Sequence, residues 1–206
     1  MSINDIRQAV LAGNEAGAAS LARAELEAGT PPHQIMDAAL IGAMDEAGAK
    51  MATGELFIPE VLAAADAMKA AMDVISPHLV GEETATRGTV VIGAVEGDVH
   101  DIGKSLVALM LDGAGFTVVD LGVDVRADAF VAAAAEHRAD VVAMSSLMVT
   151  TMPKMKVVIG ALHEAHLDAK PIVGGAPLTQ AYADEIGAAG YAPDAGGAVR
   201  LVRELL

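Results

Sequence analysis

The first 78 residues repeat apolar positions at three- and four-residue steps, the spacing that forms one face of an α-helix. Ser2 and Asp5 stand at capping-box spacing at the start of the first apolar segment, which ends at Gly13. The same pattern predicts three more helices, at about residues 14–28, 30–51 and 58–76. Because the loops between these segments are short, an antiparallel four-helix bundle is the simplest arrangement.

The hydrophobic pattern changes after residue 88, where short continuous apolar runs alternate with helical segments. The predicted strands are residues 89–95, 117–123, 141–146, 171–175 and, more weakly, 190–192. The predicted helices are residues 101–114, 127–137, 153–166, 177–187 and 196–206. This alternation is typical of a parallel sheet covered by helices on both faces. We therefore predict an α/β fold, in which the helical bundle precedes a flavodoxin-like, doubly wound five-stranded parallel sheet.

Residues 80–88 separate the two patterns. This stretch, "VGEETATRG", is polar, has a glycine near each end and shows no apolar period, so it is predicted to be a linker. The predicted domains are therefore residues 1–79 and residues 89–206.

Charge and composition restrict the partners of the chain. Its formal net charge is -15, whereas surfaces that bind nucleic acid or anionic membranes are usually basic, so we expect neither partner. The absence of cysteine excludes disulfides and thiolate metal ligands and fits a cytoplasmic protein. The first residues lack a secretory signal pattern, and no uncharged apolar stretch is long enough to span a bilayer.

Candidate functional residues gather after the predicted strands. In a doubly wound sheet these loops lie together at the carboxyl edge, where ligands bind beside the first strand. They contain Asp98, His100 and Gly103; Ser145, Ser146, Thr150 and Thr151; Gly174 and Gly175; and Ala192 and Asp194. The small residues among them leave room for a large ligand close to the backbone. Glu96 is expected to be only a solvated charge.

Three other kinds of site on this fold fit the loops poorly. A phosphoacceptor receiver domain needs an aspartate after the third strand, where Ser145 stands, and a lysine after the fifth, where none follows. A flavin mononucleotide site needs a hydroxyl-rich phosphate loop after the first strand, but this loop is acidic. A dinucleotide site needs G-x-G-x-x-G there, which "GDVHDIG" lacks. A surface histidine held by an aspartate, without function, remains the plainest alternative.

His100 suggests a metal that uses a single imidazole. No other histidine or cysteine lies nearby in the sequence, so a tetrahedral zinc site would lack ligands. A metal already held by a macrocycle needs only one axial ligand. An imidazole ligand usually bonds a carboxylate through its other nitrogen, and Asp98 is placed to be that partner.

Three motifs resemble those of a known family. They are D-x-H-x-x-G at residues 98–103, S-x-L at 145–147 and G-G at 174–175. Together they resemble the corrinoid (cobalamin-binding) proteins of methylamine and methanol methyltransferase systems, and the cap plus cobalamin-binding modules of cobalamin-dependent methionine synthase. The segment "GELFIPEVLAAADAMKAAMDVISPHL" also resembles the last helix of the helical cap domain in that family. The resemblance covers nearly the whole chain.

The resemblance implies roles for individual residues. His100 would be the lower axial ligand of cobalt, Asp98 would bond its other nitrogen, and Thr151 would supply the hydroxyl that bonds the aspartate. The displaced nucleotide tail of the cofactor would lie along the sheet edge, with Ser145 bonding the base of the tail. The cofactor-binding residues expected there are Asp101, Ile102, Gly103, Ser145, Leu147, Val149, Thr150, Gly174, Gly175 and Ala192. Val149 departs from the family, which commonly has threonine at that place.

The helical cap would cover the methyl face of the corrin. Met51, Phe57, Ile58 and Val61 match the covering residues, although for each of them a place in the bundle core is an equal alternative. The cap must move aside for each partner protein, which would make the linker at 80–88 a hinge.

The implied function is that of a methyl-group carrier with cobalamin or a related corrinoid, methylcobalamin being the loaded form. It would take a methyl group from a substrate-specific methyltransferase and pass it to a second methyltransferase with a thiol or tetrahydrofolate acceptor. A reductive activation protein would restore oxidised cobalt. Such a chain is the cofactor-carrying subunit and is not catalytic alone. The alternatives are a cobalamin-dependent sensor or regulator, and the small subunit of an adenosylcobalamin isomerase. Methylamines, methanol, betaines, thiols and aryl methyl ethers all remain open as methyl donors.

Overall fold

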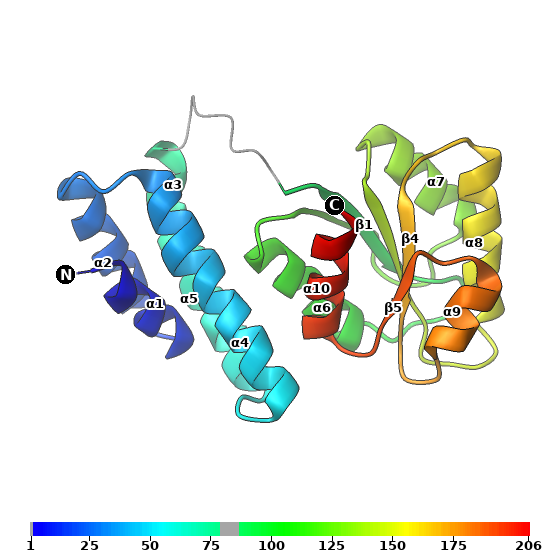
Figure 1. Ribbon diagram of the computed structural model, residues 1–206, viewed down its shortest axis with the longest axis horizontal. Helices are drawn as coiled ribbons and strands as arrows, with labels where there is room; N and C mark the ends of the chain where they lie inside the picture. Colours follow the sequence, from blue (N-terminus) through cyan, green and yellow to red (C-terminus); the bar gives the residue numbers. More distant parts are fainter. Residues whose placement is uncertain (1, 79–86) are drawn as a thin grey trace. The chain divides into compact units, whose positions relative to one another are not determined.

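A computed structural model describes residues 2–78 and 87–206, which fall into two compact units (Figure 1). One unit holds the helices of the first 78 residues and the other holds the sheet. The predicted linker at 80–88 lies outside the described residues except for Arg87 and Gly88. Among the described residues, no helix combines the length and the hydropathy needed to cross a membrane.

The first unit is entirely helical. Its elements are α1 (Ile3–Leu11), α2 (Glu15–Glu27), α3 (Pro32–Gln34), the π-helical η1 (Ile35–Ile41), α4 (Gly42–Thr53), α5 (Ile58–Ile75) and the 3-10 turn η2 (Ser76–His78). The third predicted helix is therefore a single helical run from Pro32 to Thr53, but its middle is a π-helix that the apolar period did not predict. The backbone amide of Ser2 donates to the Asp5 carboxylate at 2.8 Å, as the capping-box spacing predicted.

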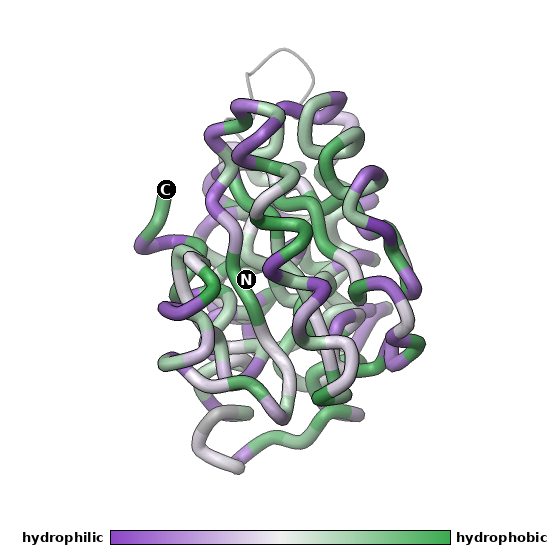
Figure 2. The backbone as a smooth tube through the Cα atoms, turned by 90° about the vertical axis from the view of Figure 1, so that its right-hand side faces the viewer, coloured by the Kyte–Doolittle hydropathy of each residue, from purple (hydrophilic) through white to green (hydrophobic). Residues whose placement is uncertain are grey.

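Packing within this unit makes a four-helix bundle. Both α1 and α5 pack against α2 and α4, and α1 and α5 also contact each other. Hydrophobic and hydrophilic residues alternate along the helical segments nearest the viewer in Figure 2, and the same kind of alternation along the bundle helices gives each of them one apolar side. The largest fully buried side chains of the bundle are Ile6, Val10, Ile35, Leu40, Met44, Val61 and Ile75.

The second unit confirms the predicted α/β fold and its five-stranded parallel sheet. The strands are β1 (Thr89–Ala94), β2 (Thr117–Asp120), β3 (Val141–Ser145), β4 (Lys170–Gly174) and β5 (Gly190–Ala192). Their order in the sheet is β2-β1-β3-β4-β5, and every pair is parallel. The chain therefore reverses its winding direction beside β1, which is the switch point at which ligands bind in such sheets.

Helices cover both faces of this sheet. They are α6 (Ile102–Gly113), α7 (Ala127–Glu136), α8 (Pro153–Glu164), α9 (Gln180–Ile186) and α10 (Ala195–Leu205). In Figure 1, α6 and α10 lie on one face, and α7, α8 and α9 lie on the other. The predicted second strand is shorter than expected, because β2 ends at Asp120 and Gly122 takes a positive φ of 80° in the loop that follows.

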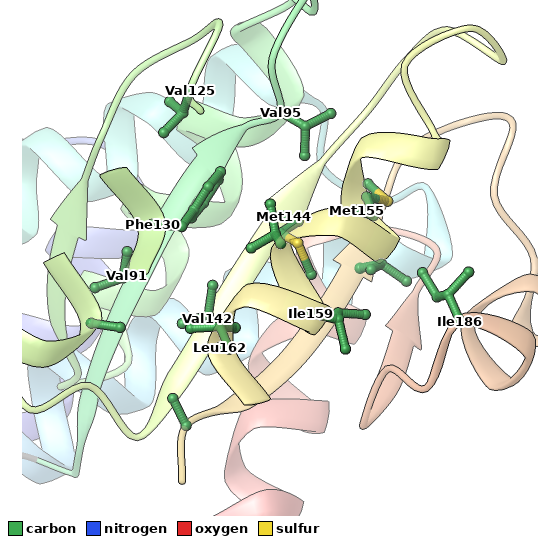
Figure 3. Packing of buried hydrophobic residues seen from close by; sticks show 14 of the residues in the cluster. Val91, Val95, Val125, Phe130, Val142, Met144, Met155, Ile159, Leu162 and Ile186 are labelled. Atoms are coloured by element: carbon green, nitrogen blue, oxygen red, sulfur yellow. The ribbon is translucent and has the colours of Figure 1, made fainter. Parts of the chain in front are cut away.

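The face covered by α7, α8 and α9 carries a close-packed core (Figure 3). Phe130 of α7 is fully buried against β1, at the level of Gly93. A Cβ on Gly93 would lie 2.9 Å from the Phe130 ring, so the strand needs glycine where the ring passes. This contact packs α7 against β1 just before the loop that follows the strand.

Candidate functional site

Two loops at the carboxyl edge of the sheet form the candidate site. Because β1 and β3 are neighbours in register, with Ala94 opposite Ser145, the loops that follow them leave the sheet side by side. The Val95 amide donates to the Ser145 carbonyl at 3.1 Å and extends the pairing into these loops. The structure thereby brings the Asp98–His100 segment next to residues 146–151.

Asp98 is the centre of the site and has no exposed surface. Its Oδ1 accepts from Nδ1 of His100 at 2.8 Å and from the His100 backbone amide at 3.0 Å. Its Oδ2 accepts from the Leu147 backbone amide at 2.7 Å and from the Thr151 hydroxyl at 3.0 Å. Both carboxylate oxygens are therefore bonded by donors from two loops.

These donors decide the ionisation of Asp98. Burial alone would raise the pKa of this carboxyl, because it disfavours the charged form. The amides of Leu147 and His100, the His100 imidazole and the Thr151 hydroxyl outweigh burial and hold the pKa of Asp98 well below its usual range. Asp98 is therefore a buried anion at neutral pH, sustained by hydrogen bonds to its charged form.

The His100 side chain is 47% exposed, so the imidazole reaches solvent while its inner nitrogen is held. The bond to Asp98 places the ring proton on Nδ1 and directs the lone pair of a neutral ring to Nε2. Nowhere in residues 2–78 and 87–206 do three or more His, Asp or Glu side chains gather to hold a metal ion.

Ser146 joins this network, although the sequence motif assigned a role only to its neighbour Ser145. Its hydroxyl is fully buried, 2.7 Å from the Thr151 hydroxyl and 3.3 Å from Oδ2 of Asp98. Side chains alternate between the two faces at the end of β3, so Ser145 and Ser146 face opposite sides. The hydrogen bonds show that Ser146 belongs with Asp98 and Thr151, which alternation alone does not reveal.

Gly175 shapes the same loop from the neighbouring strand. Its φ is +138°, and a Cβ at this position would lie 1.8 Å from the Ser146 carbonyl oxygen. Only glycine allows the chain after β4 to pass so close to Ser146. Gly174 is less tightly enclosed, since a Cβ there would lie 3.1 Å from the Ala192 carbonyl oxygen, and Gly103 faces open space. Ala192 is buried at the end of β5.

Apolar side chains are exposed in the loops after β1 and β3 and at the start of α6. Val99, Ile102, Leu147 and Val149 are 67%, 73%, 46% and 72% exposed, respectively. Asp101 and Thr150 are exposed as well, and Ser145 is half-buried at the end of β3. Exposed apolar side chains on the loops that carry the imidazole and its partners suit a large ligand that is partly hydrophobic.

The residues predicted to cover the ligand occupy two kinds of environment in the helical unit. Phe57 and Ile58 are exposed at the start of α5, at 67% and 43%, and Met51 is half-buried. The Phe57 backbone amide donates to the Glu60 carboxylate at 2.8 Å and fixes the start of the helix. Val61 has no exposed surface and lies in the bundle core, which was the alternative left open for it.

Near the site lie two ion pairs that the sequence did not suggest. Glu96, expected to be only solvated, pairs from the loop after β1 with Lys154 in the first turn of α8, at 2.7 Å. Lys104 of α6 is almost fully buried and pairs with Asp120 at the end of β2. Both pairs join groups far apart in the chain, so no local pattern announces them.

Two families of B12 binding domains match this chain. One matches residues 88–200, which include the whole sheet, and the other matches residues 2–76 in the helical unit.

The chain is similar to several curated proteins. It is 45% identical to trimethylamine corrinoid protein 2 of Methanosarcina mazei over 193 residues, covering 92% of this chain and 88% of the relative. It is 37% identical to a corrinoid protein of Desulfitobacterium hafniense over 209 residues, covering 99% and 97%.

Solved structures agree with this similarity. The methanol:cobalamin methyltransferase complex MtaBC of Methanosarcina barkeri matches with a TM-score of 0.87 and 33% identity, covering 96% of this chain and 76% of that chain. A cobalamin-binding protein of Desulfitobacterium hafniense matches with a TM-score of 0.83 and 27% identity, covering 100% and 98%.

Proposed function

This chain belongs to the B12-binding corrinoid proteins, and we propose that it is a methyl-group carrier in which His100 is the lower ligand of the corrinoid cobalt. Its cofactor is cobalamin or a related corrinoid. One observation supports the role of His100 above all others: a half-exposed imidazole stands on a buried aspartate anion at 2.8 Å.

The residues present fit such a cofactor. A corrin ring supplies four nitrogen ligands of its own, so a single imidazole completes the lower side without further protein ligands. The exposed apolar side chains of Val99, Ile102 and Leu147 offer contact surface to a broad, partly hydrophobic ring. Gly103, which faces open space, leaves room beside the first turn of α6 for the displaced tail.

When bound, the corrinoid supplies a cobalt centre that accepts a methyl group and releases it to an acceptor. The chain contributes the environment of that centre. Asp98 holds the proton on Nδ1 of His100, which fixes the ring orientation and makes Nε2 a stronger donor. The Thr151 hydroxyl and the Leu147 amide keep Asp98 ionised and in place behind the imidazole.

Further cofactor contacts belong to the same proposal. Ser145, Val149 and Thr150 after β3, Gly174 and Gly175 after β4, and Ala192 after β5 would line the path of the tail. In the helical unit, Phe57 and Ile58 expose apolar surface that would cover the methyl face, with Met51 beside them in sequence. Residues 1–79 would form the cap, 80–88 the linker and 89–206 the cofactor-binding domain.

The partners follow from the carrier role. The relatives are named for trimethylamine and methanol systems, so we propose a substrate-specific methyltransferase for a methylamine or methanol as the donor partner. A second methyltransferase would accept the methyl group on a thiol or on tetrahydrofolate, and a reductive activation protein would rescue oxidised cobalt.

The visible spectrum of the bound corrinoid tests the ligand role. The protein is reconstituted with aquocobalamin as wild type, as His100→Ala and as the control His137→Ala, in which an exposed histidine at the end of α7 is removed. His100→Ala should shift the absorption bands, because the lower ligand is lost, and His137→Ala should not. An unchanged spectrum in His100→Ala would contradict the proposal.

A further inference from the structure

Asp124, in the loop after β2, holds the loop that carries Asp98 and His100. Its Oδ1 accepts from the Gly97 backbone amide at 2.6 Å. Its own backbone amide donates to the Asp98 carbonyl at 2.9 Å. Asp124 thus bonds both the Gly97 amide and the Asp98 carbonyl, the two ends of the Gly97–Asp98 segment. We propose that Asp124 is a positioning residue for the Asp98–His100 pair, an inference that rests on the proposed function.

The backbone of Asp98 is fixed on both sides once Asp124 is in place. The Asp98 amide donates to the Val95 carbonyl at 2.9 Å, and its carbonyl accepts from Asp124. Its side chain is bonded through both oxygens. Because backbone and side chain are both fixed, a shift of the Asp98 carbonyl would also move the carboxylate that orients the imidazole.

Asp124 is itself anchored to the sheet. Val125 forms a bridge with Val95, and its amide donates to the Ala94 carbonyl at 2.9 Å, which continues the pairing of β1 beyond the end of β2. Val125 is also buried. The anchor next to Asp124 therefore belongs to the sheet core.

The backbone conformation of Asp124 is one that aspartate tolerates. Its φ is 55°, in the left-handed region, which residues other than glycine adopt seldom and which Asp and Asn tolerate best. The conformation turns the carboxylate back toward the neighbouring loop, where it meets the Gly97 amide.

Gly97 links Asp124 to the other side of the network. Its φ is +84°, and a Cβ there would lie 3.3 Å from the Thr151 methyl group. Gly97 is thus confined between Asp124, which bonds its amide, and Thr151, which bonds Asp98. Loss of the Asp124 acceptor would release Gly97 at the point where the loop approaches the hydroxyl pair.

Two variants distinguish the effect of the Asp124 acceptor oxygen from the effects of its backbone conformation and its charge. Asp124→Gly keeps the left-handed conformation but removes the acceptor, whereas Asp124→Asn keeps the Oδ1 acceptor and removes the charge. Asp128→Ala is the matched control, because Asp128 is an exposed acid in the first turn of α7 that pairs with Arg126 and not with this loop. All are full-length proteins.

The first readout needs no cofactor. Hydrogen exchange of the Gly97 amide, followed by NMR in the apoprotein, should become about tenfold faster in Asp124→Gly, because a charge-assisted hydrogen bond is lost. Asp124→Asn and Asp128→Ala should stay within about threefold of wild type. Equal Gly97 exchange in Asp124→Gly and wild type would overturn the inference, and so would an Asp124→Asn variant as fast as Asp124→Gly.

The second readout uses aquocobalamin as the probe. Asp124→Gly should bind it about tenfold more weakly, with part of the spectral change of His100→Ala, and Asp124→Asn should restore both properties. Full wild-type affinity and spectrum in Asp124→Gly would overturn the inference. If His100→Ala itself leaves the spectrum unchanged, the proposed function fails, and Gly97 exchange in the apoprotein still decides whether Asp124 positions the loop.

Discussion

Ser146 and Thr151 join their hydroxyls at 2.7 Å directly behind the Asp98 carboxylate, and both side chains are buried. Thr151 donates to Asp98, and Ser146 can then donate to Thr151. The pair turns a single aspartate–histidine contact into a chain of polar groups that reaches from solvent at His100 into the core. Such a chain is stable only while every member has its partner.

Thr151→Val should therefore destabilise the protein by about 1–2 kcal/mol, because it removes a buried donor to a carboxylate while preserving the shape of the side chain. Thr151→Ser, which keeps the hydroxyl, should retain most of that stability. Thr150→Val, at the exposed neighbouring position, should change the free energy of unfolding by less than about 0.5 kcal/mol. Urea denaturation measures all three, and equal effects of the two valine variants would contradict the network.

Gly175→Ala should destabilise the protein by more than about 3 kcal/mol, since its new Cβ would overlap the Ser146 carbonyl oxygen at 1.8 Å. Gly187→Ala is the matched control, because Gly187 also has a positive φ, of +77°, but nothing lies within 4 Å of its Cβ position. That control should cost only about 1–2 kcal/mol from backbone strain. Thermal unfolding compares the two, and a similar loss in both would show that the contact with Ser146 does not matter.

Asp120→Ala should be more destabilising than Lys104→Met. The first change leaves Lys104, whose side chain is 3% exposed, without its carboxylate partner, whereas the second leaves the Asp120 side chain, which is 37% exposed, in reach of water. A cost of about 2 kcal/mol is expected for Asp120→Ala, below that of a fully buried pair. Arg126→Ala breaks a pair that is 70% exposed on both sides and should cost under about 1 kcal/mol. The reverse order in urea denaturation would contradict this assignment.

Variants of Phe57 and Val61, which lie only one helical turn apart, should affect different properties: protection of the cofactor and stability of the bundle. Phe57→Ala should leave the free energy of unfolding nearly unchanged, because the ring is 67% exposed, but should speed photolysis of added methylcobalamin bound to the protein. Val61→Ala should cost about 2 kcal/mol, because Val61 is fully buried. Equal photolysis rates in Phe57→Ala and wild type would rule out a covering role for Phe57.

Most of the fold was predictable from the sequence because its signals are local. The helical period and the caps at Ser2 and Gly13 mark the bundle, and continuous apolar runs mark the strands of a buried parallel sheet. The structure differs from the prediction at two places where the local hydrophobic pattern was misleading. The second strand stops at Asp120 because Gly122 turns the chain, and the third helix contains a π-helical segment that no apolar spacing revealed.

The sequence by itself also determined which residues carry the candidate chemistry, because Asp98 and His100 are neighbours in one short loop and need no tertiary contact to be found. Only the tertiary structure decided what holds them. The Leu147 amide and the Asp124 carboxylate reach this loop from 49 and 27 residues away. The parallel pairing of β1 with β2 and β3 brings these residues, distant in the sequence, to the same edge of the sheet. Hydrogen bonds between loops depend on the strand register, and hydrophobic periodicity does not encode that register. The groups that hold Asp98 and His100 in place can therefore be identified only from the folded sheet.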